Sequence, residues 1–277
     1  MPESLFSQMT NDAVFENDQD APKDTMIDRK NIPFNGVIEA PPGEVEKHPR
    51  LSSGIPLLPG SAEIRGWSEF ADPSDDQGQE SSCVGRAWAH WLECMLRRYV
   101  AQSAIPFGQN LDARKIWARG REMFWGGDLT GGLFVHQGLL AMIDLGIVPD
   151  GSIAMRVTEE TMSASQVLLS TPVVWAHNVS AAWYTPDPVS GCIDPGVAPD
   201  GIGAHCTCYL ERLVQKGIGF CLFENSWGGG WGWHGLGVML EEDAIDYRLA
   251  NSFYTARLPD NWATWRGWEK YLIQAEG

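Results

Sequence analysis

The sequence predicts an α+β fold with two lobes, the first mainly helical and the second mainly an antiparallel β-sheet. Before residue 150, three segments place apolar residues at helical spacing. After residue 165, four short segments are rich in β-branched and aromatic residues and are separated by Gly, Pro, Asp and Asn. Because the helical segments precede the strands instead of alternating with them, the two layers should segregate.

The predicted helices cover residues 83–101, 112–125 and 132–146. Ser81 and Ser82 are suitable N-cap residues for the first helix, and Gly146 is a suitable stop for the third. The first helix is amphipathic because its apolar residues follow one another at three- and four-residue steps. These residues are Ala87, Trp88, Trp91, Leu92, Met95, Leu96 and Tyr99.

The predicted strands lie in residues 171–179, 204–214, 218–227 and 236–240. After these strands in the sequence, the C-terminal segment has Trp262, Trp265 and Trp268 at three-residue steps. We interpret this stripe as core packing in preference to a ligand platform.

The composition narrows the possible partners and the compartment. The chain has 277 residues, 44% of them hydrophobic, and a formal net charge of −16. Such a charge disfavours binding to nucleic acid or to anionic lipid, since both need a basic face. The start of the sequence has no signal-peptide pattern and no apolar run is long enough to span a bilayer. Six cysteines are too few for a disulfide scaffold, so we expect reduced thiols and a cytoplasmic protein, with incorporation into a viral particle as an option.

Residues 1–50 differ from the rest because they are polar and acidic, and prolines interrupt them at positions that include Pro22, Pro33, Pro41, Pro42 and Pro49. We expect this arm to be either a free tail or a segment held by the domain or by a partner. An assembly partner could bind through this arm and through the C-terminal tail, residues 256–277.

Cys83 lies where a polar turn becomes the first predicted helix, and it is the candidate nucleophile. A helix N-terminus and a nearby imidazolium both lower the pKa of a thiol. Of the six histidines, His205 stands out because "GIGAHCTCYL" indicates a glycine-containing turn that enters a strand. Asn225 could orient the imidazole, and Trp227 could shield that hydrogen bond from water.

An oxyanion that develops at a substrate carbonyl needs two donors. The backbone N–H of Cys83 is one candidate, and the side-chain amide of Gln77, six positions earlier, is the other. Cys206 and Cys208 could suggest a metal site with His205, but alternate strand residues face opposite sides. We therefore expect no metal site and no cofactor.

Three motifs in this order resemble the papain-like cysteine peptidases, in particular their bacterial and phage branch. They are "QGQESSC", "AHCTCYL" and "ENSWGGGWGWHGLG", and the resemblance extends from about Leu57 to about Leu240. It implies a papain-like two-lobe fold with a cleft between the lobes. It also implies that Cys83 is the nucleophile, His205 the general base and acid, Asn225 the orienting residue and Gln77 the oxyanion donor.

The resemblance further implies how a substrate would bind. Gly131 and Gly132 would pair with the substrate backbone. Trp227 would be a further substrate-binding residue. An apolar specificity pocket would be lined by Leu133, Phe134, Ala176 and Ala204.

The sequence departs from the family pattern near the nucleophile. Glu80 and about Leu129 stand where secreted members have a cysteine pair, which fits a reducing compartment. Val84 replaces the usual Trp, and Ser81 replaces a usual Gly. The 50-residue arm is too short and irregular to match the family's helical inhibitory pro-region.

We therefore expect a peptidase domain over residues 51–255, with a helical lobe at about 83–160 and a β lobe at about 165–255. The expected activity is that of a cysteine endopeptidase that forms a thioester acyl-enzyme with a peptide or protein substrate. Two alternatives stay open. One is a structural or docking component of a larger assembly, such as a phage particle, that retains the fold, and the other is a hydrolase of peptidoglycan cross-bridges.

Overall fold

The computed structural model describes residues 37–38, 41, 66–73, 75–100, 105–157, 171–194, 202–249 and 252–273. The arm of residues 1–50 therefore lies outside the described residues, except for Val37, Ile38 and Pro41. Within the described part, no helix has the length and apolar character needed to cross a bilayer.

The three predicted helices are α3 (Cys83–Tyr99), α4 (Ala113–Trp125) and α5 (Val135–Asp144). Asp112 caps α4 by accepting a hydrogen bond from the Lys115 backbone N–H, and Gly146 follows α5 with a φ of 69°, as its predicted role as a stop requires. Of the two serines considered as N-cap residues of α3, Ser82 occupies that position. Its side chain makes no capping hydrogen bond, and its hydroxyl accepts a hydrogen bond from Arg86 Nε at 3.0 Å instead.

In the described part of the chain, the sheet has six antiparallel strands in the order β1-β6-β2-β3-β4-β5. The four predicted strands correspond to β2 (Val173–Val179), β3 (Gly203–Gln215), β4 (Ile218–Glu224) and β5 (Leu236–Leu240). The sequence did not reveal β1 (Ile153–Arg156) and β6 (Tyr254–Arg257), which have only four residues each. β6 crosses residue 256, where we expected the tail to begin.

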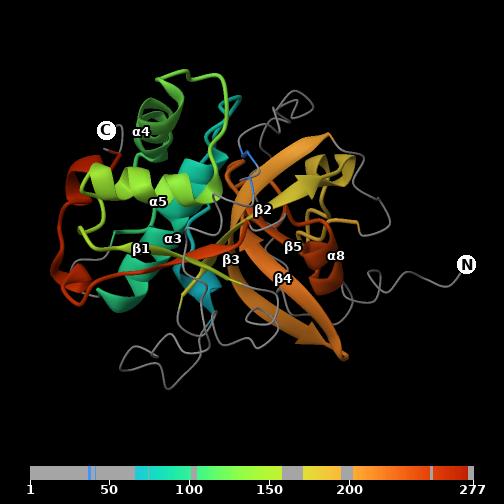
Figure 1. The fold of residues 1–277 in the computed structure, drawn as a ribbon. Helices are drawn as coiled ribbons and strands as arrows, with labels where there is room; N and C mark the ends of the chain where they lie inside the picture. Colours follow the sequence, from blue (N-terminus) through green and yellow to red (C-terminus); the bar gives the residue numbers. More distant parts are fainter. Residues whose placement is uncertain are drawn as a thin grey trace, which may run out of the picture.

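Helices α3, α4 and α5 gather on one side of the sheet, with α3 at its face, as Figure 1 shows. Here α3 is buried along almost its whole length, and its N-terminal end approaches α4 closely. A Cβ atom on Gly85 would lie 2.7 Å from the Ala113 carbonyl oxygen, so only glycine permits this approach. The other sheet face packs a second apolar cluster that includes Trp175, Trp183 and Trp227.

Short elements complete the fold. They are the helix α8 (Glu241–Asp246) and the 3₁₀ turns η2 (Trp67–Phe70), η3 (Ala181–Tyr184), η4 (Trp262–Thr264) and η5 (Glu269–Tyr271).

The C-terminal tail packs against the helical part, where Figure 1 draws it in red. Trp262 and Trp268 are buried in the main core, and Trp265 Nε1 donates a hydrogen bond to the Gly146 carbonyl at 3.0 Å. The prediction that this tryptophan stripe serves core packing is therefore confirmed.

Candidate active site

His205 on β3 and Asn225, which directly follows the neighbouring strand β4, form a hydrogen bond. His205 Nε2 lies 2.7 Å from Asn225 Oδ1, which also accepts a bond from the Ser226 backbone N–H at 2.8 Å. Because that oxygen is an acceptor for both partners, the Nε2 atom carries the proton. In this tautomer Nδ1 is the ring nitrogen with the lone pair, which is the atom that can take up a proton.

Trp227 covers this pair. Its ring centroid lies 4.8 Å from that of His205, and Trp227 is fully buried. Burial lowers the pKa of His205 to about 4, although the bond to Asn225 opposes the shift. The imidazole is therefore neutral near pH 7, which is the form that can accept a proton.

Cys83 begins α3, and its side chain has no exposed surface. The backbone N–H of Cys206 hydrogen-bonds to its sulfur, so the thiol lies beside the residue that follows His205. Burial raises the pKa of Cys83 to about 12, although the N–H groups of Cys206 and Val84 oppose the shift. We expected the helix N-terminus to favour a thiolate, but here burial outweighs that effect and the resting thiol is neutral.

Gln77 is held at the end of β4 by its backbone and by its side chain. The Gln77 N–H donates to the Ser226 carbonyl at 2.9 Å, and Ser226 Oγ donates to Gln77 Oε1 at 2.6 Å. Gln77 Nε2 donates to the Glu80 carbonyl at 2.9 Å. An amide nitrogen has two hydrogens, so one remains for a ligand.

The edge expected to pair with a substrate backbone is partly occupied. Gly131 and Gly132 already accept hydrogen bonds at their carbonyls, from Trp117 Nε1 at 3.0 Å and Arg121 Nη1 at 2.8 Å. Leu133 then pairs in a parallel bridge with a residue of the N-terminal arm, Val37.

This arm contact is specific in its hydrogen bonding and packing. The Ile38 N–H donates to the Leu133 carbonyl at 2.9 Å, and Val37 is 6% exposed within the main core. The domain thus holds this part of the arm, which was one of the options left open for it.

The residues proposed for the apolar pocket are only partly brought together. Leu133, Ala176 and Ala204 pack in or against one apolar cluster, and Ala176 faces Cys206 in the β2–β3 register. Phe134 instead contacts the Trp125 ring, with centroids 5.4 Å apart. Leu133 and Ala176 are fully buried, so no open pocket exists between them here.

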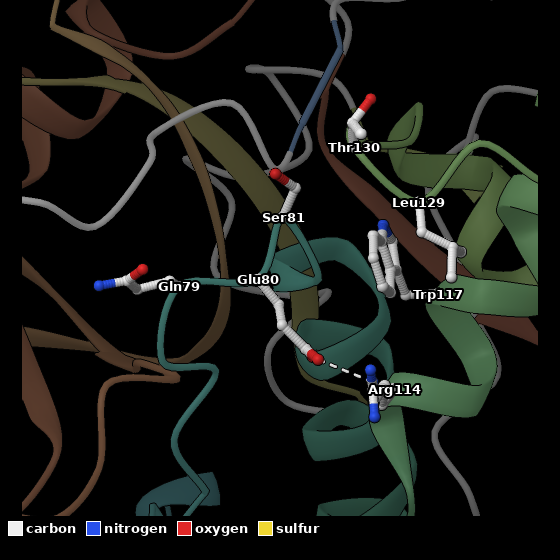
Figure 2. Close-up of a pocket in the computed structure, with 7 residues that line it drawn as sticks. All are labelled: Gln79, Glu80, Ser81, Arg114, Trp117, Leu129 and Thr130. Atoms are coloured by element: carbon white, nitrogen blue, oxygen red, sulfur yellow. Dashed lines mark ion pairs between the residues drawn. The ribbon is translucent and has the colours of Figure 1, made fainter.

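A cavity of about 340 Å³ lies between the residues before Cys83 and those before Gly131. Figure 2 shows Glu80 and Arg114 directed toward one another at this cavity, where Arg114 Nε lies 2.7 Å from Glu80 Oε1. Glu80 occupies the position at which secreted relatives were expected to have a cysteine, and all six thiols of the chain are free. The lining residues are Gln79, Glu80, Ser81, Arg114, Trp117, Leu129 and Thr130.

The sequence did not reveal several residues around the site. Ser226 orients Gln77, and its place in "ENSW" was the available signal. His177 faces His205 across β2 and β3, and burial lowers its pKa, with the charge of His205 as a second cause. Among the described residues, no cluster of three or more His, Cys, Asp or Glu side chains could hold a metal ion.

No protein-family model matches this chain, and no curated protein sequence does either. Solved structures do match, and among them is xylellain, a cysteine protease from Xylella fastidiosa. It has a TM-score of 0.59 and 15% identity, and the match covers 85% of this chain and all of xylellain. The chain has the papain-like fold.

Two further structures with this fold are similar. Procathepsin B S9 from Trypanosoma congolense has a TM-score of 0.56 and 11% identity, over 81% of this chain and 87% of that one. Digestive procathepsin L 3 from Tenebrio molitor has a TM-score of 0.53 and 15% identity, over 77% of each chain. The prediction of a papain-like α+β fold is therefore confirmed.

Proposed function

We propose that this chain is a cysteine peptidase that uses Cys83, His205, Asn225 and Gln77. One observation carries the proposal, namely the bond of His205 Nε2 to Asn225 Oδ1 beside a strand residue, Cys206, whose N–H hydrogen-bonds to the Cys83 sulfur. A nucleophile, a base and a residue that orients the base are the minimum for covalent acyl transfer.

In the first half of the reaction, His205 Nδ1 takes the proton of the Cys83 thiol as the sulfur attacks a substrate carbonyl. The oxyanion receives hydrogen bonds from the Cys83 N–H and from the remaining hydrogen of Gln77 Nε2. The imidazolium then protonates the leaving amine, the C–N bond breaks, and a thioester on Cys83 remains.

In the second half, the neutral His205 takes a proton from water as the water oxygen attacks the thioester. The carboxylic acid product leaves, and the thiol regains its proton from His205. Throughout, Asn225 keeps the Nε2 proton in place, which prevents the ring from presenting the wrong nitrogen to the sulfur.

Substrate binding in this proposal requires the arm to leave the backbone edge. The side chains of Cys83, His205 and Asn225 have almost no exposed surface, and Val37 and Ile38 pair with Leu133. An extended peptide would compete with this pairing through the same main-chain groups.

The cavity beside Glu80 would take a substrate side chain near the scissile bond. It adjoins both the nucleophile segment and the segment of Gly131, and its Glu80–Arg114 ion pair makes it polar. A polar or charged side chain would therefore be accepted there more readily than a large apolar one.

A thiol-directed epoxysuccinyl probe tests the proposal. Under reducing conditions we expect one probe per chain, located at Cys83 by mass spectrometry, and no labelling in a His205→Ala variant that keeps its fold. Labelling of several cysteines at equal rates, or equal labelling in His205→Ala, would count against a paired thiol and imidazole.

A second function is favoured by the complete burial of Cys83, namely a docking component that retains the fold without turnover. This candidate would be supported if the probe labels neither the folded wild-type chain nor a folded Val37→Asp variant, in which the arm contact is weakened. Peptide and peptidoglycan cross-bridge substrates share the same amide chemistry, and parallel assays on unfolded protein and on cell-wall fragments separate them.

A further inference from the structure

A stripe of charged side chains runs through the interior along the helix that begins with Cys83. On α3, Arg86, His90, Glu93 and Arg97 follow one another at three- and four-residue steps, so they share one side of the helix. Each is 7% exposed or less. Charged groups are seldom buried to this degree without partners.

The partners of His90 come from the two segments that carry Gln77 and Asn225. His90 Nε2 lies 3.7 Å from Asp75 Oδ2, two residues before Gln77. His90 Nδ1 lies 3.7 Å from Glu224 Oε1, directly before Asn225. The imidazole of His90 therefore lies between one carboxylate from each segment.

The other charges extend this arrangement in both directions. Arg86 forms an ion pair with Asp75, and Arg97 Nη2 lies 3.3 Å from Asp72 Oδ2. Glu93 Oε1 accepts a hydrogen bond from the Leu111 N–H at 2.7 Å. We call these residues the ionic cluster, and it consists of Asp72, Asp75, Arg86, His90, Glu93, Arg97 and Glu224.

The cluster has three basic side chains and four carboxyl groups, and a further carboxylate, that of Glu80, borders it, with its Oε2 atom 3.8 Å from Arg86 Nη2. The thiols of Cys94 on α3 and Cys208 on β3 also face it, and burial raises the pKa of both. Burial raises the pKa of Glu93 to about 7 and also raises that of Glu224. Glu93 and Glu224 thus hold a proton more readily than carboxyl groups in water.

His90 keeps its proton in these surroundings. Burial lowers its pKa, but the carboxylates of Glu224, Asp75 and Glu93 raise it by more, to about 9. Burial likewise raises the pKa of Asp75, but His90 and Arg86 lower it by more. Near pH 7, His90 is therefore a cation between two carboxyl groups.

We propose that the ionic cluster positions the two halves of the active site, because protonated His90 holds Asp75 and Glu224 together and thereby fixes Gln77 relative to Asn225. His90 and Glu224 are positioning residues and touch no substrate. This inference rests on the proposed function for its effect on catalysis. The hold of His90 on Asp75 and Glu224 can itself be measured without turnover.

The test replaces His90 with an uncharged residue of similar size. In His90→Gln, we expect the kcat for peptide hydrolysis and the labelling rate of Cys83 to fall about 10- to 100-fold, with little change in KM. The wild-type labelling rate should decline as pH rises through about 9, and this decline should vanish in the variant. Arg119→Gln, which removes the exposed ion pairs of Arg119 with Asp144 and Glu122, is the matched control and should behave as wild type.

A Glu224→Gln variant provides a second test of the positioning role in case His90→Gln does not fold. It keeps the shape of the side chain and removes one carboxylate, so it should lower the rate as well and shift the alkaline limb to lower pH. A rate and pH profile equal to wild type in a folded variant would overturn the positioning role while leaving the proposed function intact.

Exchange of the His205 Nε2 proton with water, measured by NMR, distinguishes a failure of the proposed function from a failure of the positioning role of His90. If the wild type neither turns over nor takes up the probe, the proposed function fails, and the exchange rate alone decides the inference. Faster exchange in His90→Gln supports the positioning role of His90, because Asn225 is then less firmly held. An unchanged exchange rate contradicts it.

Discussion

Two fully buried histidines of this chain lie in different surroundings and have opposite pKa shifts. Burial lowers the pKa of His205 to about 4, with the neutral amide of Asn225 as its partner. Burial also acts on His90, but three carboxyl groups raise the pKa to about 9. The charge of the partner, and not burial by itself, decides which form of a buried imidazole is stable.

This difference suits two different tasks. A neutral imidazole with its proton on Nε2 has a lone pair on Nδ1 and can accept a proton there, which the proposed chemistry requires of His205. A permanently protonated imidazole between carboxylates cannot do so, but it can hold two chain segments together. The same residue type thus serves as a candidate base on β3 and as a structural cation on α3.

The largest expected effect comes from replacing the histidine that is proposed as the base. His205→Gln should lower kcat/KM by about 10⁴-fold, since both the base and the acid are lost. His177→Gln, which changes the buried histidine opposite His205 in the sheet, should keep activity within about tenfold. A larger loss in His177→Gln than in His205→Gln, at equal fold content by circular dichroism, would reverse the assignment.

A smaller loss is expected at the oxyanion donor. Gln77→Ala should lower kcat by about 10² to 10³ with KM little changed, because the bond forms only as charge develops. Ser226→Ala removes the hydroxyl that orients Gln77 and should cost less, about tenfold. Steady-state kinetics on one peptide would check both, and equal effects on KM and kcat would contradict an oxyanion role.

The two histidines should also give stability opposite dependences on pH. The raised pKa of His90 contributes stability that is complete below about 6.5 and is lost as pH rises through about 9, by up to about 3 kcal/mol. The lowered pKa of His205 contributes stability above about 6.5 that is lost as pH falls through about 4. Denaturant unfolding from pH 4 to pH 10 should show a flatter alkaline side in His90→Gln and a flatter acid side in His205→Gln.

The smallest expected effect concerns access to the site. Val37→Asp places a charge in the apolar core and should weaken the pairing with Leu133, which would raise the labelling rate of Cys83 about tenfold. Pro41→Asp changes an exposed residue of the same arm and should leave the rate unchanged. A lower rate in Val37→Asp would mean that the arm completes the site instead of covering it.

Much of the fold could be predicted because its elements have strong local signals. The helix at Cys83 and the four longer strands have clear periodicity, and the C-terminal tryptophans have the spacing of packed residues. The strands β1 and β6 were not predicted because a segment of four residues carries too little periodic pattern. They also pair with each other across a long stretch of chain, which no local signal records. The N-cap position of α3 at Ser82 was predictable, but the bond of its hydroxyl to Arg86 was not, because it depends on tertiary burial of the Arg86 side chain.

The candidate site was predictable in its composition but not in its electrostatics. The motifs and their resemblance to a known family pointed to Gln77, Cys83, His205 and Asn225 as candidates, and the contact of the last two with each other agrees with that hypothesis. The neutral state of Cys83 depends on complete desolvation, which no local pattern records. The ionic cluster was missed because charged residues on a helix normally mark its solvent face.

One NMR titration of ¹⁵N-labelled histidines tests the central comparison most directly. We expect His205 to be neutral at pH 7 with its proton on Nε2, and to take up a second proton only near pH 4. In the same sample, His90 should stay doubly protonated until about pH 9. A neutral His90 at pH 7, or a His205 with its proton on Nδ1, would contradict the account.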